Sequence, residues 1–464
     1  MLEAIVAADN LNSAYRKVVE NGGAGGVDGM DAKHLLPYLL ANGEALRQAI
    51  LEGRYRPSPT RWAEIPKDDG QTRRLGIPTV VDRMVQRAIA QTLGPVYEPK
   101  SSEASYAYRP GRSALDAVRK CVEHLREGRV WAVDLDLDDF FDTVDQGKLM
   151  EILSRDIRDR RVLSLIERCL RAGTLKQGRF EETEIGVPQG SPLSPLLANV
   201  MLGELDREME RRGLRFLRYA DDIAILCRTR DEADEALKGI APYIEVELGL
   251  KIDWGKTAVV HATDMRFLGY AFREGPEGIQ PHAHERSIAK MRARTQELLD
   301  ACADAGDMSE LRLYVTGWIS YYRLSDVRRL LAEDCGWMNG YVRSLFWRAW
   351  HTCALKGERG GKAPSPGIWA RVAALSRPCR TEARLPFRSR SPLRALGQAL
   401  SAAALILGAG LLLVCAKDAD LRYLLVGAGA NAILSSLRDL LRRAPAAPAR
   451  PKPRPTRQAT SPFI

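Results

Sequence analysis

The chain has 464 residues, 28% of them charged, and a formal net charge of +10 at pH 7. This length suits two to four domains with an ample core and excludes a single small module. The eight cysteines are scattered, without a CxxC pair or a Cys/His cluster at zinc-ligand spacing, which favours a reducing compartment with buried thiols. Six of the ten net positive charges lie after Asp439, so the tail is a polycation separate from the body.

The N-terminal third alternates helical segments with loops. Its first residues include acids and no long apolar run, so we expect no signal peptide and a cytoplasmic protein. A glycine-rich loop, Asn21 to Met30, is followed by helical periodicity to about Gly53. Two strand-like runs, Ala63–Pro66 and Arg74–Ile77, flank an Asp-Asp-Gly turn and predict a hairpin. Helical spacing then recurs over Val80–Tyr97 and 113–126.

The middle of the chain mixes strands and helices. "RVWAVDLDLDDFFDTV" (129–144) predicts a strand that runs into a helix, with Asp138 or Asp139 able to cap it. "GVPQGSPLSPLLANVML" (186–202) predicts a turn-rich start and then a helix, and "LRYADDIAIL" (217–226) a strand hairpin. A helix over 231–249 and a short strand "FLGYAF" (267–272) follow.

From about His284 to Trp350 the segments predict helices that carry basic and aromatic residues together. A region rich in Gly, Pro, Ser and Arg, 356–392, predicts a linker. This order of strands and helices indicates an α+β core with a helical C-terminal appendage.

Two apolar runs near the C-terminus predict a helical hairpin over 393–440. Ala395–Ala416 holds 22 residues without a charge, enough to span a bilayer as a helix, and Tyr423–Leu437 is also uncharged. Arginines flank both ends, so a membrane hairpin over 395–437 would keep both ends cytoplasmic, tethered to the inner membrane. The alternative is a soluble Ala/Gly-rich helical pair. The Pro-rich basic tail, 441–464, suits an extended, disordered segment.

The pair Asp221 and Asp222 lies inside an apolar hairpin. Two carboxylates about 4 Å apart repel by roughly 4 kcal/mol at an effective dielectric near 20. Upstream, Asp134 and Asp136 alternate with apolar residues and so share one strand face. If the two segments pair, acids gather at one sheet edge, where they suit Mg²⁺ and two-metal phosphoryl transfer. The alternative is that the pair is a solvated turn.

Seven motifs in one order make the interpretation specific. Together they resemble the reverse transcriptase domain of bacterial group II intron-encoded proteins, closely over residues 25 to about 270. "GWISYYRLSD" (317–326) extends the likeness more weakly into a maturase-like region. The seven are "IPKDDGQTRRLGIPTVVDRMVQRAI" (65–89), "SYAYRPGRSALDAV" (105–118), "DLDDFFD" (136–142), "GVPQGSPLSPLLANVML" (186–202), "YADD" (219–222), "LGLKIDWGKT" (248–257) and "FLGY" (267–270).

The resemblance implies a right-hand polymerase fold of fingers, palm and helical thumb. The implied domains are an N-terminal extension with fingers (1–125), a palm with the catalytic site interleaved with the fingers (126–275) and a helical thumb or maturase-like domain (276–355). The linker, apolar hairpin and tail follow. The His/Cys nuclease that often ends mobile members of the family has no counterpart pattern in this sequence.

The resemblance also assigns roles by position. Asp136, Asp221 and Asp222 would be the catalytic, metal-binding triad, with the backbone carbonyl of Leu137 as a further ligand of two Mg²⁺ (or Mn²⁺) ions. The residues implied to bind the incoming nucleotide are Lys67, Arg73, Arg74, Phe141, Gln189 and Lys256. The family usually has Pro where this chain has Arg74, so either Arg73 or Arg74 would pair with the triphosphate.

Phe141 matches the family's steric gate, five residues after Asp136. A ring there would crowd a ribose 2′-OH and so favour deoxynucleotides; the alternative is ordinary packing at a strand-to-helix junction. Template binding needs positive charge and stacking surfaces. Arg109, Arg343 and Arg348 are the implied nucleic-acid contacts, whereas the thumb aromatics could equally pack the helices.

These features predict an RNA-directed DNA polymerase, a nucleotidyltransferase. Its partners would be dNTPs, an RNA template, a DNA or RNA primer and a cognate intron or non-coding RNA. One alternative is a splicing maturase that folds its intron. Another, resting on the C-terminal segments alone, is a membrane-tethered reverse transcriptase acting in antiviral defence against phage.

Overall fold

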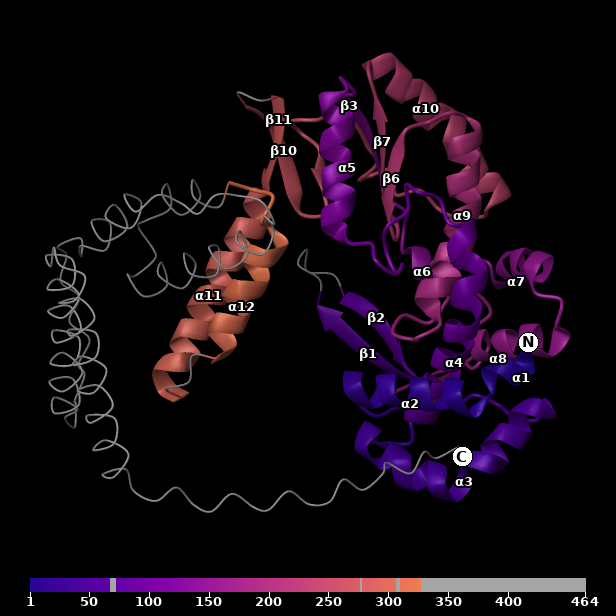
Figure 1. The fold of residues 1–464 in the computed structure, drawn as a ribbon. Helices are drawn as coiled ribbons and strands as arrows, with labels where there is room; N and C mark the ends of the chain where they lie inside the picture. Colours follow the sequence, from indigo (N-terminus) through magenta and orange to yellow (C-terminus); the bar gives the residue numbers. More distant parts are fainter. Residues whose placement is uncertain (67–71, 276–277, 306–308, 327–464) are drawn as a thin grey trace, which may run out of the picture. The chain divides into compact units, whose positions relative to one another are not determined.

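A computed structural model describes residues 1–66, 72–275, 278–305 and 309–326 of the chain. Helices and strands alternate through most of it (Figure 1), so the expected mixed α+β composition is confirmed. Arg343, Arg348, the linker, the apolar hairpin and the tail lie outside the described residues, as does Lys67. Within those residues, the structure contains no helix with the length and hydropathy needed to cross a bilayer.

The N-terminal helices pack around α4. Asn10 on α2 donates to the carbonyl of Ala88 on α4, 3.0 Å away. The glycine-rich loop is held by arginines: Arg83 donates to the carbonyls of Gly22 and Ala24, and Arg61 to that of Gly25. These helices are α1 (Leu2–Ile5), α2 (Ala8–Asn21), the 3₁₀ turn Ala32–His34, α3 (Leu35–Leu51), α4 (Val80–Tyr97) and the 3₁₀ turn Glu98–Lys100.

The predicted hairpin is present, with strands longer than expected. β1 (Thr60–Pro66) pairs antiparallel with β2 (Thr72–Ile77), and β4 (Thr174–Lys176) and β5 (Arg179–Glu181) extend the sheet in the order β2-β1-β4-β5. Gly76 on β2 donates its N–H to the carbonyl of Gln189, 2.9 Å away. That bond fixes β2 to the "PQG" turn.

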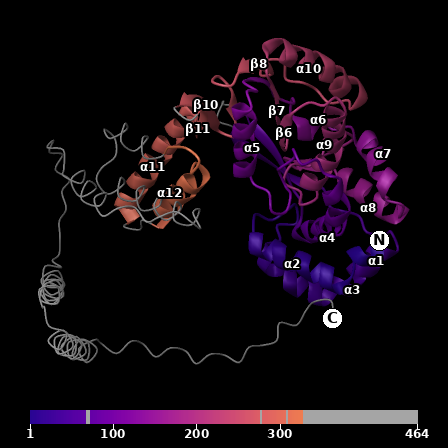
Figure 2. The ribbon, with the colours of Figure 1, turned by 45° about the horizontal axis from the view of Figure 1, so that its top comes forward.

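A second sheet, in the order β6-β7-β3-β8, separates two hydrophobic cores. Its strands are β3 (Trp131–Leu135), β6 (Phe216–Tyr219), β7 (Asp222–Cys227) and β8 (Ala258–His261), all antiparallel to their neighbours. Val133 and Ile223 face one core, and Ala132 and Ala224 the other, as the alternation of a strand requires. Figures 1 and 2 show α5 on one side of this sheet and α9 and α10 on the other.

The helices of this region extend or divide the predicted ones. They are α5 (Ala114–Arg126), α6 (Phe140–Thr143), α7 (Gln146–Asp156), α8 (Arg160–Leu170), α9 (Ser194–Arg211), α10 (Arg230–Pro242) and a π-helical turn Tyr243–Glu247. Asp139 does precede α6, as predicted for a cap, but its side chain makes no capping bond and its φ is +39°.

The strand predicted over 267–272 is wrong in one respect, because the chain turns inside it. β9 (Arg266–Phe267) pairs with β10 (Tyr270–Gly275) across the two residues Leu268 and Gly269, whose φ angles of +53° and +77° are those of a tight hairpin turn. β11 (Gly278–Ala283) completes this sheet, and α11 (Glu285–Ala305) and α12 (Ser309–Tyr321) follow.

Candidate active site

The two acidic segments meet at one end of the β3–β7 pair. The register places Leu135 opposite Ile223, so Asp136 leaves β3 next to the start of β7, where Asp221 and Asp222 lie. Ala220, in the β6–β7 turn, has a φ of +60°. A non-glycine residue in that region costs about 1–3 kcal/mol and is common at functional sites. The fold therefore brings together carboxylates that are 85 positions apart in the numbering.

A cavity of about 190 Å³ opens at this sheet end and holds most of the predicted site residues. The predicted residues among its lining are Arg74, Asp136, Leu137, Phe141, Gln189, Asp221 and Lys256. Thr72, Asp139, Phe140 and Asp142 complete the lining. Seven positions that the resemblance selects from five separate segments thus share one small polar space.

Asp136 is half-buried and faces a cation. Lys256 Nζ lies 4.0 Å from its carboxylate and 2.8 Å from that of Asp253. Burial raises the pKa of Asp136, Lys256 opposes the rise, and the carboxylates of Asp253 and Asp221 add to it. The net excess of negative charge at this position is what a bound cation would offset.

The "LGLKIDWGKT" segment holds the end of β3 in place. Asp138 donates its N–H to the Lys251 carbonyl and Asp253 donates to the Asp136 carbonyl, each at 2.9 Å. Thr257 Oγ1 accepts from the Asp136 N–H at 3.1 Å. These bonds fix the backbone of Asp136 and carry Lys256 to its carboxylate.

Asp222 has different surroundings from Asp221. Asp221 lines the cavity, whereas Asp222 is not among the residues that line it. Burial, followed by the charges of Asp134 and Asp221, raises the pKa of Asp222 to about 7. Burial and Asp136 likewise raise the pKa of Asp134 to about 6. The sequence pattern distinguishes Asp134 only as the strand neighbour of Asp136, and the structure adds it to the acidic group.

The donor set fits a hard divalent cation that shares its coordination with substrate. Among the described residues, no three His, Cys, Asp or Glu side chains stand in a geometry that could hold a metal ion by themselves. Asp136 and Asp221 are two of the four aspartates that line the same cavity, and Mg²⁺ is commonly bound by one or two carboxylates together with substrate phosphates. The cavity therefore suits a cation that arrives with a nucleotide.

Arg73 and Arg74 are adjacent residues of β2. Arg74 lines the cavity, and its guanidinium lies 5.8 Å from the centre of the Trp62 ring. Arg73 pairs with Ile65 in the register and Arg74 with Glu64. Pairing of Arg73 or of Arg74 with the triphosphate stays a prediction.

Arg109 is engaged inside the protein. It is buried, and its guanidinium donates to Glu98 at 2.8 and 3.0 Å and to the carbonyls of Ser102 and Ser105. These bonds give Arg109 a structural part in holding the loop after α4. Contact of Arg109 with nucleic acid stays a prediction.

A buried arginine that the sequence did not single out supports the β6–β7 turn. Arg218 is fully buried, and its guanidinium donates to both carboxylate oxygens of Asp206, at 2.6 and 2.7 Å. It also donates to Asn199 Oδ1 and to the Ala220 carbonyl, each at 3.1 Å. The sequence signal for a buried role of Arg218 is a charged residue at an inward position of an apolar hairpin, directly before "YADD".

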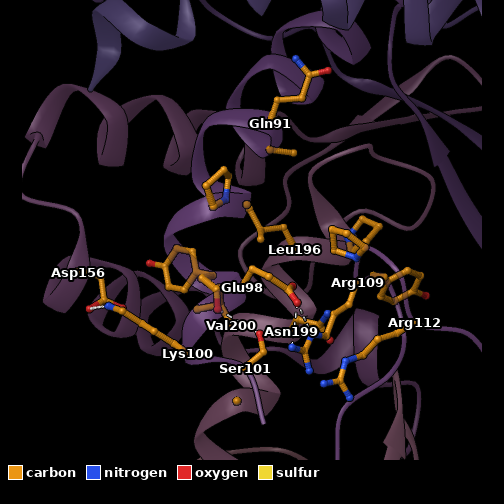
Figure 3. A pocket seen from close by; sticks show the side chains of 18 of the residues that line it. Gln91, Glu98, Lys100, Ser101, Arg109, Arg112, Asp156, Leu196, Asn199 and Val200 are labelled. Atoms are coloured by element: carbon orange, nitrogen blue, oxygen red, sulfur yellow. Dashed lines mark hydrogen bonds and ion pairs between the residues drawn. The ribbon is translucent and has the colours of Figure 1, made fainter. Parts of the chain in front are cut away.

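A larger cavity of about 860 Å³ lies on the other side of this network. Figure 3 shows its walls, where Lys100 reaches Asp156 and Arg109 reaches Glu98. Asn199 and Asp206, the partners of Arg218, belong to the same walls. The lining also contains cationic and aromatic side chains from α4 and the loop that follows it, among them Arg87, Tyr108 and Arg112.

Comparison with known proteins places the chain in a family. Residues 65–272 match the family described as "Reverse transcriptase (RNA-dependent DNA polymerase)", and residues 288–360 match "Group II intron, maturase-specific domain". Protein YkfC of Escherichia coli (strain K12) is 32% identical over 312 residues, which cover 58% of this chain and 82% of YkfC.

Two further relatives match over shorter shares. Group II intron-encoded protein LtrA of Lactococcus lactis subsp. cremoris is 36% identical over 38% of this chain and 29% of LtrA, so the match spans less than a third of that relative. A solved chain of a partial Cas6-RT-Cas1–Cas2 complex is 26% identical over 53% of this chain and 42% of that chain, with a TM-score of 0.35. The chain belongs to the family of group II intron-encoded reverse transcriptases and maturases.

Proposed function

We propose that the chain is an RNA-directed DNA polymerase that extends a primer with deoxynucleotides. The observation that carries the proposal is the cavity where Asp136 and Asp221, from two different strands, meet Phe141, Gln189 and Lys256. In the reaction, the primer 3′-oxygen forms a bond to the α-phosphorus of a dNTP. The bond from that phosphorus to the bridging oxygen breaks, pyrophosphate leaves, and the hydroxyl proton passes to solvent.

Different residues of the chain would bind the metal ions and the triphosphate. Asp136 and Asp221, with Asp222 and the Leu137 carbonyl, would hold two Mg²⁺ ions, or Mn²⁺, which supply charge stabilisation for the attacking and leaving oxygens. Arg74 faces the triphosphate side, with Lys67 and Arg73 from the same hairpin as further candidates. Lys256 orients Asp136 from the opposite wall, 4.0 Å away.

The right-hand description follows as part of the proposal. The β2-β1-β4-β5 sheet with the N-terminal helices would form the fingers, the β6-β7-β3-β8 sheet the palm, and α11 with α12 the start of the thumb. The larger cavity combines cations and an exposed aromatic residue, Tyr108, a combination that suits single-stranded nucleic acid such as an RNA template.

Asp221→Ala tests the assignment. Because Asp221 is one of the two carboxylates on the cavity that we assign to the metal ions, and their charge stabilisation amounts to several kcal/mol, its loss should reduce DNA synthesis by at least about a hundredfold. The measurement is extension of a DNA primer on an RNA template with dNTPs and Mg²⁺. Asp231→Ala, an exposed acid at the start of α10, is the matched control and should retain activity. Undiminished synthesis by Asp221→Ala would refute the proposal.

Splicing assistance is a second candidate, favoured by the match of residues 288–360 to the maturase-specific domain. Both functions need RNA bound beside the same core, so they are compatible in one chain. The RNA that crosslinks to the chain in cells separates them, since a maturase recovers intron sequence and a dedicated polymerase recovers other templates.

A further inference from the structure

A tight turn presents Gln189 to the small cavity. The Ser191 N–H donates to the Pro188 carbonyl at 3.3 Å, and of the two central residues Gly190 alone has a positive φ, +102°. This combination is typical of a type II turn, which favours glycine at its third position. Gln189 is the second residue of the turn and lines the cavity beside Asp221. The place of the Gln189 side chain in the cavity therefore depends on the turn.

Strand β2 and helix α9 hold the first part of the turn. The Gly76 N–H donates to the Gln189 carbonyl at 2.9 Å. The approach is close, since a Cβ added to Gly190 would lie 3.2 Å from the Gly76 carbonyl oxygen. The hydroxyl of Ser194, at the start of α9, donates to the Pro188 carbonyl at 2.6 Å. These bonds leave the last residue of the turn to be held by another element.

That last residue is anchored to α4. Ser191 Oγ donates to Gln86 Oε1 at 2.9 Å, and the two residues are only 7% and 3% exposed. The same Oγ accepts from the Leu193 N–H at 3.2 Å, so the hydroxyl is satisfied both as donor and as acceptor. Helix α4 begins with a side-chain cap from Thr79, which makes it a firm anchor. Because the bond is buried, its loss would leave polar atoms without a partner.

We propose that Gln86 and Ser191 are positioning residues, which hold the turn so that the Gln189 side chain meets the incoming dNTP. Neither Gln86 nor Ser191 is among the residues that line the small cavity, so their effect on a nucleotide passes through Gln189. This inference rests on the proposed polymerase function, because the nucleotide is the ligand assigned to that cavity. With the bond in place, the turn has one conformation before the dNTP arrives, and binding requires less ordering.

Two substitutions break the bond from opposite sides. Ser191→Ala removes the donor, and Gln86→Met removes the acceptor while it keeps the length of the side chain. Each should weaken dNTP binding by about two- to tenfold, the factor that corresponds to one hydrogen bond. The KM for dNTP should rise by the same factor with kcat nearly unchanged, as expected for a contact made equally in the ground state and the transition state. Ser154→Ala makes the same change at an exposed position of α7 and is the control that should leave these values unchanged.

Equilibrium binding gives a readout that is independent of the reaction. The full chain is mixed with an RNA template, Mg²⁺ and a DNA primer that ends in a 3′-dideoxynucleotide, so that no bond can form. Fluorescence of a template 2-aminopurine next to a uridine follows the binding of dATP opposite that uridine. The Kd for dATP should rise in both variants, whereas the Kd for the primer–template should stay unchanged, because only the turn is displaced.

Substitution of Gln189 tests whether the effect passes through this residue. In a Gln189→Ala chain the contact with the nucleotide is already absent, so Ser191→Ala should cause no further loss of dATP affinity. A general packing defect would lower the affinity in either background.

Unchanged dATP affinity in both Ser191→Ala and Gln86→Met would overturn the inference. An equal loss of primer–template affinity would do the same, as would a further loss from Ser191→Ala in the Gln189→Ala chain. Failure of the proposed function is distinct, because the wild-type chain would then bind no dATP in this complex and synthesise no DNA.

Discussion

At the residue scale, the adjacent acids of "YADD" are two different groups. Asp221 lines the cavity with Asp136, whereas Asp222 does not line it, and burial and the charge of Asp134 raise the pKa of Asp222. Strand alternation explains the division, since neighbouring residues at the start of β7 leave the backbone in opposite directions. Substitutions of Asp221 and Asp222 are therefore expected to have different consequences.

Phe141 is predicted to select the sugar. Its ring is buried and lines the cavity beside Asp136, and Phe140 packs against it edge to face, 5.3 Å between ring centres. Phe141→Ala opens space for a 2′-OH, so the ratio of kcat/KM for dNTP over rNTP should fall by at least about tenfold.

The ratio is measured on one preparation, so a loss of folded enzyme cancels. This matters because removal of a buried Phe ring costs about 3–5 kcal/mol of stability. Phe141→Tyr keeps the bulk and should keep the selectivity. An unchanged ratio in Phe141→Ala would leave the ring with a packing role only.

At the element scale, the β6–β7 turn depends on α9. The turn carries the strained Ala220, and the carbonyl of that residue accepts from Arg218, whose charge is balanced by Asp206 on α9. A fully buried ion pair is costly to break from one side, because the remaining charge has no solvent. The helix α9 thus helps to fix the β6–β7 turn through Arg218 and Ala220, without a contact to Asp221 in this network.

A double-mutant cycle separates stability from positioning. Arg218→Met or Asp206→Leu alone should lower the free energy of unfolding by about 3–5 kcal/mol, whereas the double variant should regain most of that loss. DNA synthesis should stay low in the double variant, because Ala220 still lacks its donor. Denaturant unfolding and primer extension measure the two effects, and full activity of a stable double variant would contradict the positioning role.

At the scale of the whole molecule, the raised pKa values of Asp134 and Asp222 make the stability of the fold depend on pH. Asp134 and Asp222 have pKa values raised to about 6 and about 7 from the ordinary 3.8. Between about pH 4 and pH 7 the folded chain therefore binds more protons at these groups than the unfolded chain, and their contribution to stability falls as pH rises. His282 acts in the opposite sense, because burial lowers its pKa to about 4.

Comparison of the wild-type chain with Asp222→Asn isolates the pH dependence of stability that Asp222 contributes, because both chains keep His282. The variant should gain stability relative to wild type between about pH 5 and pH 8, by at least about 1 kcal/mol in the free energy of unfolding. An excess of Mg²⁺ should stabilise wild type at the higher pH, because a ligand of the folded state raises its apparent stability. A difference that does not change with pH would show that Asp222 ionises normally.

The sequence by itself determined the family and the candidate residues of the site. The order of its motifs, together with the alternation of Asp134 and Asp136, predicted the family, the hairpin of β6 and β7, and seven residues that the structure gathers around one cavity. Local patterns carry this information because strand periodicity and turn chemistry act over a few residues. The turn inside "FLGYAF" was missed because leucine does not ordinarily adopt positive φ.

Only the tertiary structure decided how those groups are held. It placed Arg74 on the cavity, saturated Arg109 with internal acceptors, buried Arg218 against Asp206 and brought Tyr321 to Leu268. These contacts join different elements, some close in the chain, such as Arg109 and Glu98, and some distant, such as Tyr321 and Leu268. The periodicity of a segment does not indicate which partner satisfies a buried donor. The buried polar groups must be paired once water is excluded, and the fold alone selects the partner.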